Sequence, residues 1–325
     1  MNTAAASPVQ DGRQLAGLAC GLGAGALWGL VFLAPELVRE FSPLQLSAGR
    51  YLCYGLIAAL LLAPRWQALA PRIGVAEWRR LAWLALVGNT LYYVLLSTAV
   101  QTGGIAMTSL VIGFLPVAVT IIGSRDQGAV PLARLLPSLL LCAAGAVCIG
   151  WQALAGPATT QGLLGLICAI GALASWTTYA VGNARSLARL GPQVSAHDWN
   201  LLTGVSTGLQ GLLLMPLALA FGSTEHGADA WLRFGAVSAG VAVLASMFGN
   251  LLWNRMSRLL PLTLVGQMIL FETLFALLYG LAWERRLPGG LEVAALTCVV
   301  GSVLACLHAH RRPNAPRATS TSADR

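Results

Sequence analysis

Stretches of about 20 mostly apolar residues follow one another along this chain from Leu15 to His308, separated by short segments that contain polar residues, Gly and Pro. A helix of about 20 apolar residues is long enough to cross the hydrocarbon core of a bilayer. The pattern therefore predicts an all-α integral membrane protein with ten transmembrane helices. The expected helices cover residues 15–35, 44–63, 80–100, 104–123, 132–151, 162–183, 199–220, 231–253, 261–281 and 291–309.

Composition agrees with this pattern and argues against several other classes of protein. Hydrophobic residues make up 57% of the chain and charged residues only 10%, whereas a soluble domain has about 25% charged residues. The formal net charge of +8 comes from arginines scattered over loops and tails, so no nucleic-acid partner is expected. The chain has no Lys, which excludes a GxxxxGK phosphate loop and a Schiff-base lysine.

Neither a metal nor a cofactor is expected from the sequence. The seven cysteines all fall inside apolar stretches, where small buried thiols are the usual case. His308 and His310 end the last apolar stretch without a cluster of Cys or carboxylate residues beside them.

The arginines indicate the orientation in the membrane. Under the ten-helix prediction, Arg50 lies inside a helix, fifteen of the 20 arginines fall on the side of both termini, and four fall on the other side. Positive residues favour the cytoplasmic side, so both termini are expected in the cytoplasm and the protein in a bacterial inner membrane. Residues 1–14 are then an uncleaved cytoplasmic segment, and residues 310–325 are expected to form a disordered cytoplasmic tail.

An internal repeat is visible when the chain is compared with itself at an offset of 148 residues. Trp28 then falls on Trp176, and with a small shift Pro43 falls on Pro192. Each half contains five expected helices, and because five is odd the second half enters the membrane in the opposite orientation. Inverted repeats of this kind are typical of secondary transporters. The two expected five-helix repeats are residues 15–151 and 162–309.

Small residues and proline predict local features of two helices. Gly17, Gly21, Gly25 and Gly29 recur every four residues in the first stretch, which leaves a smooth strip for close helix packing. Pro116 lies inside the fourth stretch and removes one helical hydrogen bond, so a bend is expected there.

Several short motifs occur in a characteristic order along the chain. They are Trp28, SPLQLSAGR ending at Arg50, Pro116, SWTTYAVGNAR with Trp176 and Tyr179, and FETLFALLYGLAWERRLPGG with Glu272 and Glu284. In these motifs the chain resembles the EamA-type members of the drug/metabolite transporter superfamily, over nearly all ten expected helices. The resemblance implies export of small metabolites or drugs.

The resemblance also places two acidic residues and shows two departures. Glu272 and Glu284 fall on the two acidic positions of the family. Thr273 stands where the family usually has Pro, and Ser124, Arg125 and Asp126 stand where a glutamate is usual.

Two charged residues inside the apolar stretches are the leading candidates for a binding site, since charges are costly in hydrocarbon. Glu272 lies about 11 residues into its helix, roughly 17 Å deep at 1.5 Å per residue. It is expected to hold a cationic group or to exchange a proton, with a structural hydrogen bond to another helix as the alternative. Arg50 is expected to clamp a carboxylate or other anion, with snorkelling to the interface or an ion pair with Glu36 as alternatives.

Aromatic and amide side chains at helical spacing are candidates for the wall of a substrate cavity. Interface anchoring is the alternative role for the Trp and Tyr residues. The selected candidates are Trp28, Asn89, Tyr92, Tyr93, Trp176, Tyr179, Asn183 and Gln267. Further residues at such spacings are Tyr51 and Tyr54 beside Arg50, and the group Asn250, Trp253 and Asn254.

Together these features predict a secondary transporter that exports small metabolites, amino-acid-like compounds or drugs by alternating access, and no enzyme activity. Proton antiport through Glu272 and simple facilitated export are both compatible with the pattern. The expected partners are the bilayer and a small-molecule substrate; no oligomeric state is predicted. The alternative is an integral membrane enzyme for a lipid-linked substrate, but the loop acids are scattered and the chain has no HExxH or DxxD motif.

Overall fold

The computed structural model describes residues 8–126, 129–154, 160–285 and 287–311. Across these residues all regular structure is helical and strands are absent, which confirms the predicted all-α class. Part of the expected segment 1–14 and nearly all of the expected tail 310–325 lie outside the described residues.

The helices follow one another with short connections. They include 3₁₀ helices (η1, η2 and η4) and two π helices (η3 and η5). In chain order they are α1 (Pro8–Leu37), α2 (Pro43–Leu62), η1 (Ala63–Arg65), α3 (Trp66–Leu69), η2 (Ala70–Arg72), α4 (Val75–Ala85), η3 (Leu86–Thr90), α5 (Leu91–Ile112), α6 (Leu115–Gly123), α7 (Leu132–Leu154), α8 (Thr160–Leu190), η4 (Gly191–Gln193), α9 (Ala196–Phe221), α10 (Ala228–Val241), η5 (Ala242–Gly249), α11 (Asn250–Leu259), α12 (Leu262–Met268), α13 (Leu270–Glu284) and α14 (Gly290–Arg311).

In the described part of the chain, eight helical stretches are long and apolar enough to cross a membrane. A shorter apolar helix covers Leu132–Cys148. The count of ten transmembrane helices and the inverted repeat stay predictions. The eight stretches are Gly12–Leu37, Pro43–Arg72, Val75–Gly104, Thr160–Gln193, Ala196–Phe221, Ala228–Leu259, Leu262–Trp283 and Gly290–His310.

The expected helix over residues 104–123 is not continuous. Gly104 has φ 82° and ψ 164°, a conformation that is nearly restricted to glycine, and it separates two parts of α5. The helix then ends at Ile112 and a new one starts at Leu115, with Pro116 in the first turn of α6. Proline is tolerated in a first turn because its missing N–H has no helical partner there. Pro116 therefore lies at a helix start, and the prediction of a bend in mid-helix is wrong.

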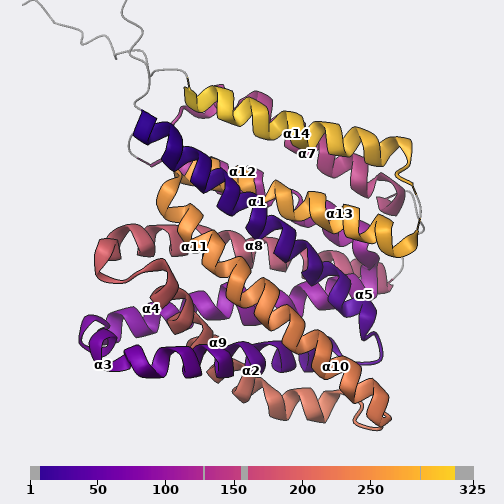
Figure 1. Ribbon diagram of the computed structural model, residues 1–325. Coiled ribbons are helices and arrows are strands. Elements are labelled where there is room, and N and C mark those ends of the chain that lie inside the picture. The colour runs from indigo at the N-terminus through magenta and orange to yellow at the C-terminus, as the bar shows by residue number, and fades with distance from the viewer. Residues whose placement is uncertain (1–7, 127–128, 155–159, 286, 312–325) are drawn as a thin grey trace, which may run out of the picture.

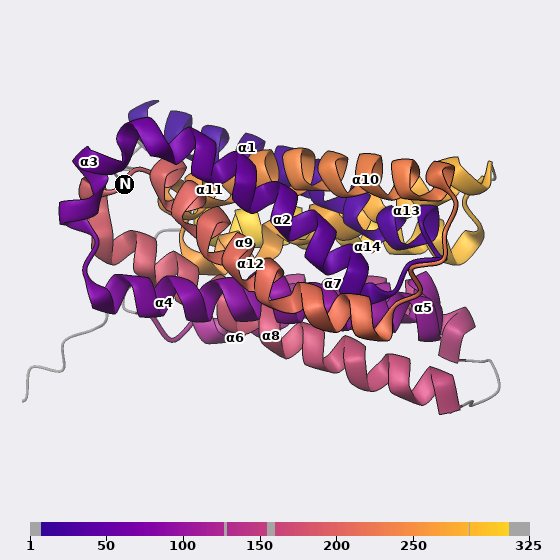
Figure 2. The ribbon, with the colours of Figure 1, turned by 90° about the horizontal axis from the view of Figure 1, so that it is seen from below.

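The long helices run between two ends of the molecule (Figure 1). The start of α1, the short helix α3 and the end of α14 lie at the left of Figure 1, and the α9–α10 and α13–α14 connections lie at the right. Figure 2 shows the same separation from below. We call the left end, which carries Arg65 and Arg72, the arginine-rich end, and the right end the opposite end.

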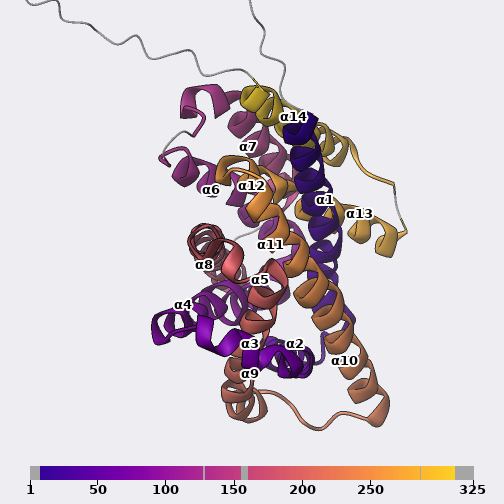
Figure 3. The same ribbon diagram turned by 60° about the vertical axis from the view of Figure 1, so that its left-hand side comes forward.

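Glycine allows several of these helices to pack closely. A Cβ atom added to Gly55 of α2 would lie 2.4 Å from Cα of Gly208 in α9. A Cβ atom on Gly25 or Gly29 of α1 would lie 2.5 Å or 2.9 Å from atoms of α13. The predicted close packing of the glycine strip is therefore confirmed. Figure 3 shows how the helices gather, with α2, α9 and α10 on one side, α7, α12 and α14 on the other, and α8 and α11 between them.

Candidate substrate site

A cavity lies between α1, α2, η3, α5, α8, α11 and α13. Its charged residues are Arg50 on α2 and Glu272 on α13, and the rest of its wall is aromatic, amide or small. The lining residues are Trp28, Val31, Arg50, Tyr51, Gly88, Asn89, Tyr92, Trp176, Tyr179, Asn250 and Glu272.

The cavity is almost filled by its own side chains. The cavity volume is about 20 Å³, which is room for roughly one water molecule. A metabolite needs a pocket of about 300 Å³ or more. The cavity in this conformation is thus too small for a metabolite, and binding of a solute requires its walls to separate.

Arg50 is held in place by neutral side chains. It is buried, with 5% of its surface exposed, and its Nε donates a hydrogen bond to Oγ of Ser246 at 3.0 Å. Its guanidinium carbon lies 4.3 Å from the ring centre of Tyr93 and 5.1 Å from that of Tyr51, and such rings attract a cation. No carboxylate in the described part of the chain lies within ion-pair distance of Arg50. Its positive charge is therefore not neutralised by a direct protein partner.

Glu272 occupies the first turn of α13, directly after the break between α12 and α13 at Ile269. Its backbone packs against α1, because a Cβ atom on Gly25 would lie 2.8 Å from the Glu272 nitrogen. The side chain is 5% exposed and faces the same cavity as Arg50. A basic and an acidic side chain therefore line one small space without forming an ion pair.

The alternative structural roles given above for Arg50 and Glu272 do not occur in this conformation. Glu36 pairs with Arg39, so the alternative of an Arg50 ion pair with Glu36 is wrong. Arg50 is buried, so its charge does not reach the interface by snorkelling. Glu272 makes no hydrogen bond to another helix within the described ranges.

Indole rings form one wall of the cavity. Trp28 of α1 and Trp176 of α8 meet edge to face with ring centres 5.6 Å apart. Trp253 lies beside both, at 5.1 Å from Trp28 and 5.0 Å from Trp176. Nε1 of Trp28 donates to the carbonyl oxygen of Ala245 at 3.0 Å, which fixes the ring. This wall can bind a cation or an apolar group.

One π helix lines the cavity, and the other holds Arg50. Gly88 and Asn89 belong to η3, and Ser246, which holds Arg50, belongs to η5. Segments of π helix are rare and often occur at functional sites. A Cβ atom on Gly88 would lie 2.2 Å from the Tyr179 ring, so glycine is required for Tyr179 to reach the cavity.

A protein family and a known protein match this chain in sequence. A family model described as the EamA-like transporter family matches residues 15–151. The inner membrane protein YtfF of Escherichia coli (strain K12) is 30% identical over 331 residues, which cover 95% of this chain and 99% of that protein. The chain belongs to the EamA-like transporter family.

A solved structure supports the fold of this EamA-family protein. It is titled only as the crystal structure of a protein, and it matches with a TM-score of 0.69 at 17% identity, covering 93% of this chain and 100% of the other. The resemblance seen in the sequence is confirmed by the family match. The inner-membrane relative and the apolar helices together make this chain a multi-pass inner membrane protein of a transporter family.

Most of the predicted site residues of the EamA-family protein meet at the cavity. Their role in binding a substrate stays a prediction. The ones that line it are Trp28, Arg50, Asn89, Tyr92, Trp176, Tyr179 and Glu272.

Three predicted site residues lie outside the cavity lining and make other contacts. The ring of Tyr93 lies against the guanidinium group of Arg50, as described above. Oδ1 of Asn183 accepts a hydrogen bond from Nε1 of Trp199 at 2.8 Å. Oε1 of Gln267 accepts one from Oγ of Ser302 at 3.0 Å. The last two residues connect helices away from the cavity.

The structure adds two lining residues that the sequence analysis did not find. Val31 lies one turn after Trp28 on the same face of α1, so helical spacing could have identified it. Gly88 has no polar or aromatic side chain that could have drawn attention to it. Tyr51 and Asn250, which the spacing had indicated, do line the cavity.

Proposed function

We propose that this EamA-family protein is a secondary transporter that exports small metabolites, amino-acid-like compounds above all, by alternating access. The observation that carries the proposal is that a basic and an acidic side chain, Arg50 and Glu272, line one small cavity without pairing. A buried charge without a partner is costly. A solute with both an ammonium and a carboxylate group neutralises both charges at once.

Arg50 is suited to the carboxylate of such a solute. A guanidinium group can donate two parallel hydrogen bonds to a carboxylate. The bond from Nε to Ser246 and the two tyrosine rings fix its orientation before binding. Asn250 adds a buried Nδ2 donor that has no hydrogen-bond partner in the described part of the chain, and it lines the same cavity.

Glu272 and the indole wall are suited to the ammonium group. The Glu272 carboxylate supplies an opposite charge, and the faces of Trp28 and Trp176 attract a cation. Glu272 is also the carboxyl group among the lining residues, so it is our candidate for exchange of a proton. Coupling to protons and facilitated export are separated by the pH-gradient measurement below.

The proposed architecture is ten transmembrane helices in two inverted halves, residues 15–151 and 162–309, with the arginine-rich end in the cytoplasm. One contact supports it: Trp28 and Trp176, which occupy equivalent positions in the two halves, meet at the cavity. The cavity takes its lining from both halves, as the alternating-access arrangement requires.

The test uses purified protein in liposomes and a panel of radiolabelled amino acids. Each amino acid is compared with the amine that lacks its carboxylate and with the acid that lacks its ammonium group. We expect at least one amino acid to move faster than both of its analogues. Arg50→Gln should abolish the preference over the amine, and Glu272→Gln the preference over the acid. Arg80→Gln, at an exposed position on α4, is the matched control and should behave as the unmodified protein.

The same liposomes separate the remaining readings. A dependence of transport on an imposed pH gradient that disappears in Glu272→Gln identifies proton coupling, and its absence identifies facilitated export. Equal movement of amino acids and analogues in every variant refutes the zwitterion site. Conversion of a lipid-linked substrate without movement of any solute supports the alternative of a membrane enzyme.

A further inference from the structure

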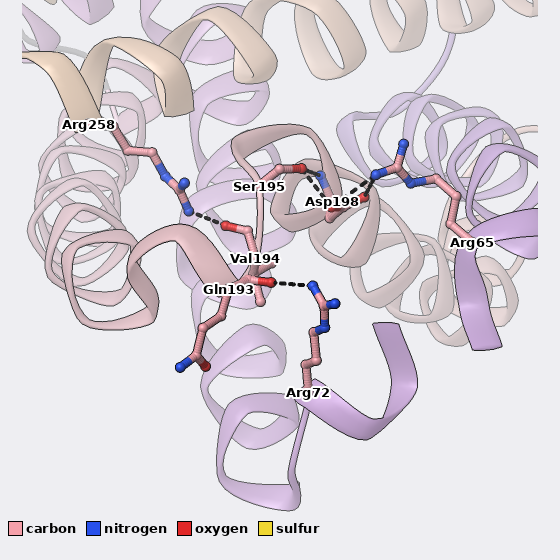
Figure 4. Close-up of polar contacts among 7 residues, drawn as sticks. All are labelled: Arg65, Arg72, Gln193, Val194, Ser195, Asp198 and Arg258. Atoms are coloured by element: carbon pink, nitrogen blue, oxygen red, sulfur yellow. Dashed lines mark hydrogen bonds and ion pairs between the residues drawn. The ribbon is translucent and has the colours of Figure 1, made fainter. Parts of the chain in front are cut away.

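Three arginines hold the connection between α8 and α9 at the arginine-rich end (Figure 4). Arg65 pairs with Asp198 at 2.9 Å, and Nη1 of Arg72 donates to the carbonyl oxygen of Gln193 at 3.0 Å. Arg258 donates to the next carbonyl along the chain. The first two arginines follow α2 and the third lies in α11, so these contacts join distant elements at this end of the molecule.

A related contact closes the opposite end. Nε2 of Gln45 in α2 donates to the carbonyl oxygen of Ser223 at 2.7 Å, in the connection between α9 and α10. Beside it Phe41, from the connection between α1 and α2, has its ring centre 4.4 Å from those of His226 and Phe234. Contacts between distant elements thus join both ends of the molecule.

The two contacts start from the same turn of their helices, three residues after a capping serine. Ser42 caps the start of α2 and bonds to the nitrogen of Gln45, three residues later. Ser195 caps the start of α9 and bonds to the nitrogen of Asp198, also three residues later. Gln45 of α2 holds the connection that follows α9, whereas Asp198 of α9 holds the connection that follows α2. Each of these helices therefore fastens the end of the other.

A second pair of contacts repeats this relation. Glu40, after α1, pairs with Arg233 of α10 at the opposite end. Arg189 of α8 pairs with Glu77 of α4 at the arginine-rich end, at 3.3 Å. The helices α1 and α8 begin the two expected halves, and α4 and α10 begin the third expected helix of each. The hydrogen bond from Arg233 lowers the pKa of Glu40, so the Glu40 carboxylate is charged at neutral pH.

Four buried hydroxyl groups on α2, α5 and α10 lie without a hydrogen-bond partner within the described residues. Ser47 lies one turn before Arg50 on α2, and Ser97 lies one turn after Tyr93 on α5. With Ser238 of α10, these serines and Tyr93 have buried hydroxyls that lack a hydrogen-bond partner within the described residues. Water or a polar solute that reaches them would satisfy them.

We propose that Gln45 and Asp198 are equivalent latches of two gates, and that breaking one latch opens its own gate and lowers the fraction of molecules in which the other gate is open. The arginine-rich gate consists of residues 63–72 and 191–198, and the opposite gate of residues 38–46 and 222–227. The proposal rests on the proposed transport by alternating access, because only that mechanism requires one gate to close when the other opens.

The test is hydrogen–deuterium exchange of the full-length protein in lipid nanodiscs. Gln45→Glu removes the donor to Ser223 but keeps an acceptor for the helix cap. Arg65→Gln breaks the other latch without touching the cap of α9, and Asp198→Asn breaks it from the other side. The exposed position of Arg80→Gln again makes it the matched control.

We expect Arg65→Gln and Asp198→Asn to raise exchange at the arginine-rich gate about fivefold, the change in population that follows from one net hydrogen bond. Exchange at the opposite gate should fall in the same variants. Gln45→Glu should produce the reverse pattern, and Arg80→Gln should change neither gate. The fall at the distant gate is the decisive result, because simple loosening of a loop does not produce it.

Two outcomes distinguish a failure of the latch proposal from a failure of the proposed transport function. If exchange rises at the altered gate and the distant gate stays unchanged or also rises, the latch proposal is overturned, while transport by the unmodified protein in liposomes leaves the proposed function standing. If the gates respond reciprocally but no solute moves in liposomes, the latches stand as a two-state device and the proposed function fails.

Discussion

A methyl group added to Gly25 should push α1 away from the start of α13. The new Cβ atom would lie 2.5 Å from Cβ of Phe271 and 2.8 Å from the nitrogen of Glu272, whereas ordinary contacts begin at 3.4 Å. The two helices must therefore separate by about 1 Å. Overpacking of this kind costs about 1–3 kcal/mol, and alanine returns up to about 1 kcal/mol through its higher helix propensity. We expect Gly25→Ala to lose about 1–2 kcal/mol of stability.

The control for this prediction is Gly280→Ala in the middle of α13. A Cβ atom there has no neighbour within 4 Å, so only the gain in helix propensity remains, and the variant should be as stable as the unmodified protein or slightly more stable. Thermal unfolding of both purified variants in the same detergent makes the comparison. Transport by Gly25→Ala should also fall, because the displaced backbone carries Glu272. Equal melting temperatures for the two variants would refute the packing argument.

Three further substitutions separate binding from stability. Ser246→Ala removes the hydrogen bond to Arg50 and should raise the KM for the substrate about tenfold or more, the effect of one bond to a charged group. Ser246→Thr keeps the hydroxyl group and should restore the original KM, and an unchanged KM of Ser246→Ala in liposomes contradicts the positioning role. Gly104→Ala should cost about 1–3 kcal/mol, since alanine is strained at φ 82°; a melting temperature equal to that of the unmodified protein argues against the observed turn. Gln267→Leu should lower stability by about 1–3 kcal/mol and leave the KM unaltered, because Gln267 bonds to Ser302 outside the cavity. A changed KM would indicate that Gln267 contributes to substrate binding.

The closed cavity and the two gates describe one state of the molecule. With room for roughly one water molecule, the aromatic side chains occupy the space that a substrate needs. Gly25 and Gly29 leave a smooth contact surface along which α1 can move against α13 to reopen it. Such a movement has to break or carry along two hydrogen bonds of α1: the one from Tyr279 of α13 to the carbonyl oxygen of Ala26 and the one from Trp28 to Ala245.

The sequence by itself determined the class of the protein. The length and hydropathy of each apolar stretch are local properties, and a bilayer leaves a helix as the way for such a stretch to satisfy its backbone. The order of the motifs identified the family, and the cost of charge in hydrocarbon singled out Arg50 and Glu272. Helical spacing then found much of the cavity wall, including Trp28 and Trp176.

Only the tertiary structure decided which face of each helix meets the cavity. Tyr92 lines it, whereas the ring of Tyr93 packs against the guanidinium group of Arg50, although the two residues are neighbours in sequence and equally aromatic. Gln267 was selected because its amide lies less than two turns before Glu272, yet it connects helices elsewhere, whereas Gly88 borders the cavity because it leaves room for Tyr179. The rotation of a helix about its axis is set by its contacts with other helices, and these contacts join residues far apart in the chain. Local patterns therefore give the polar candidates, and packing selects the ones that share a site.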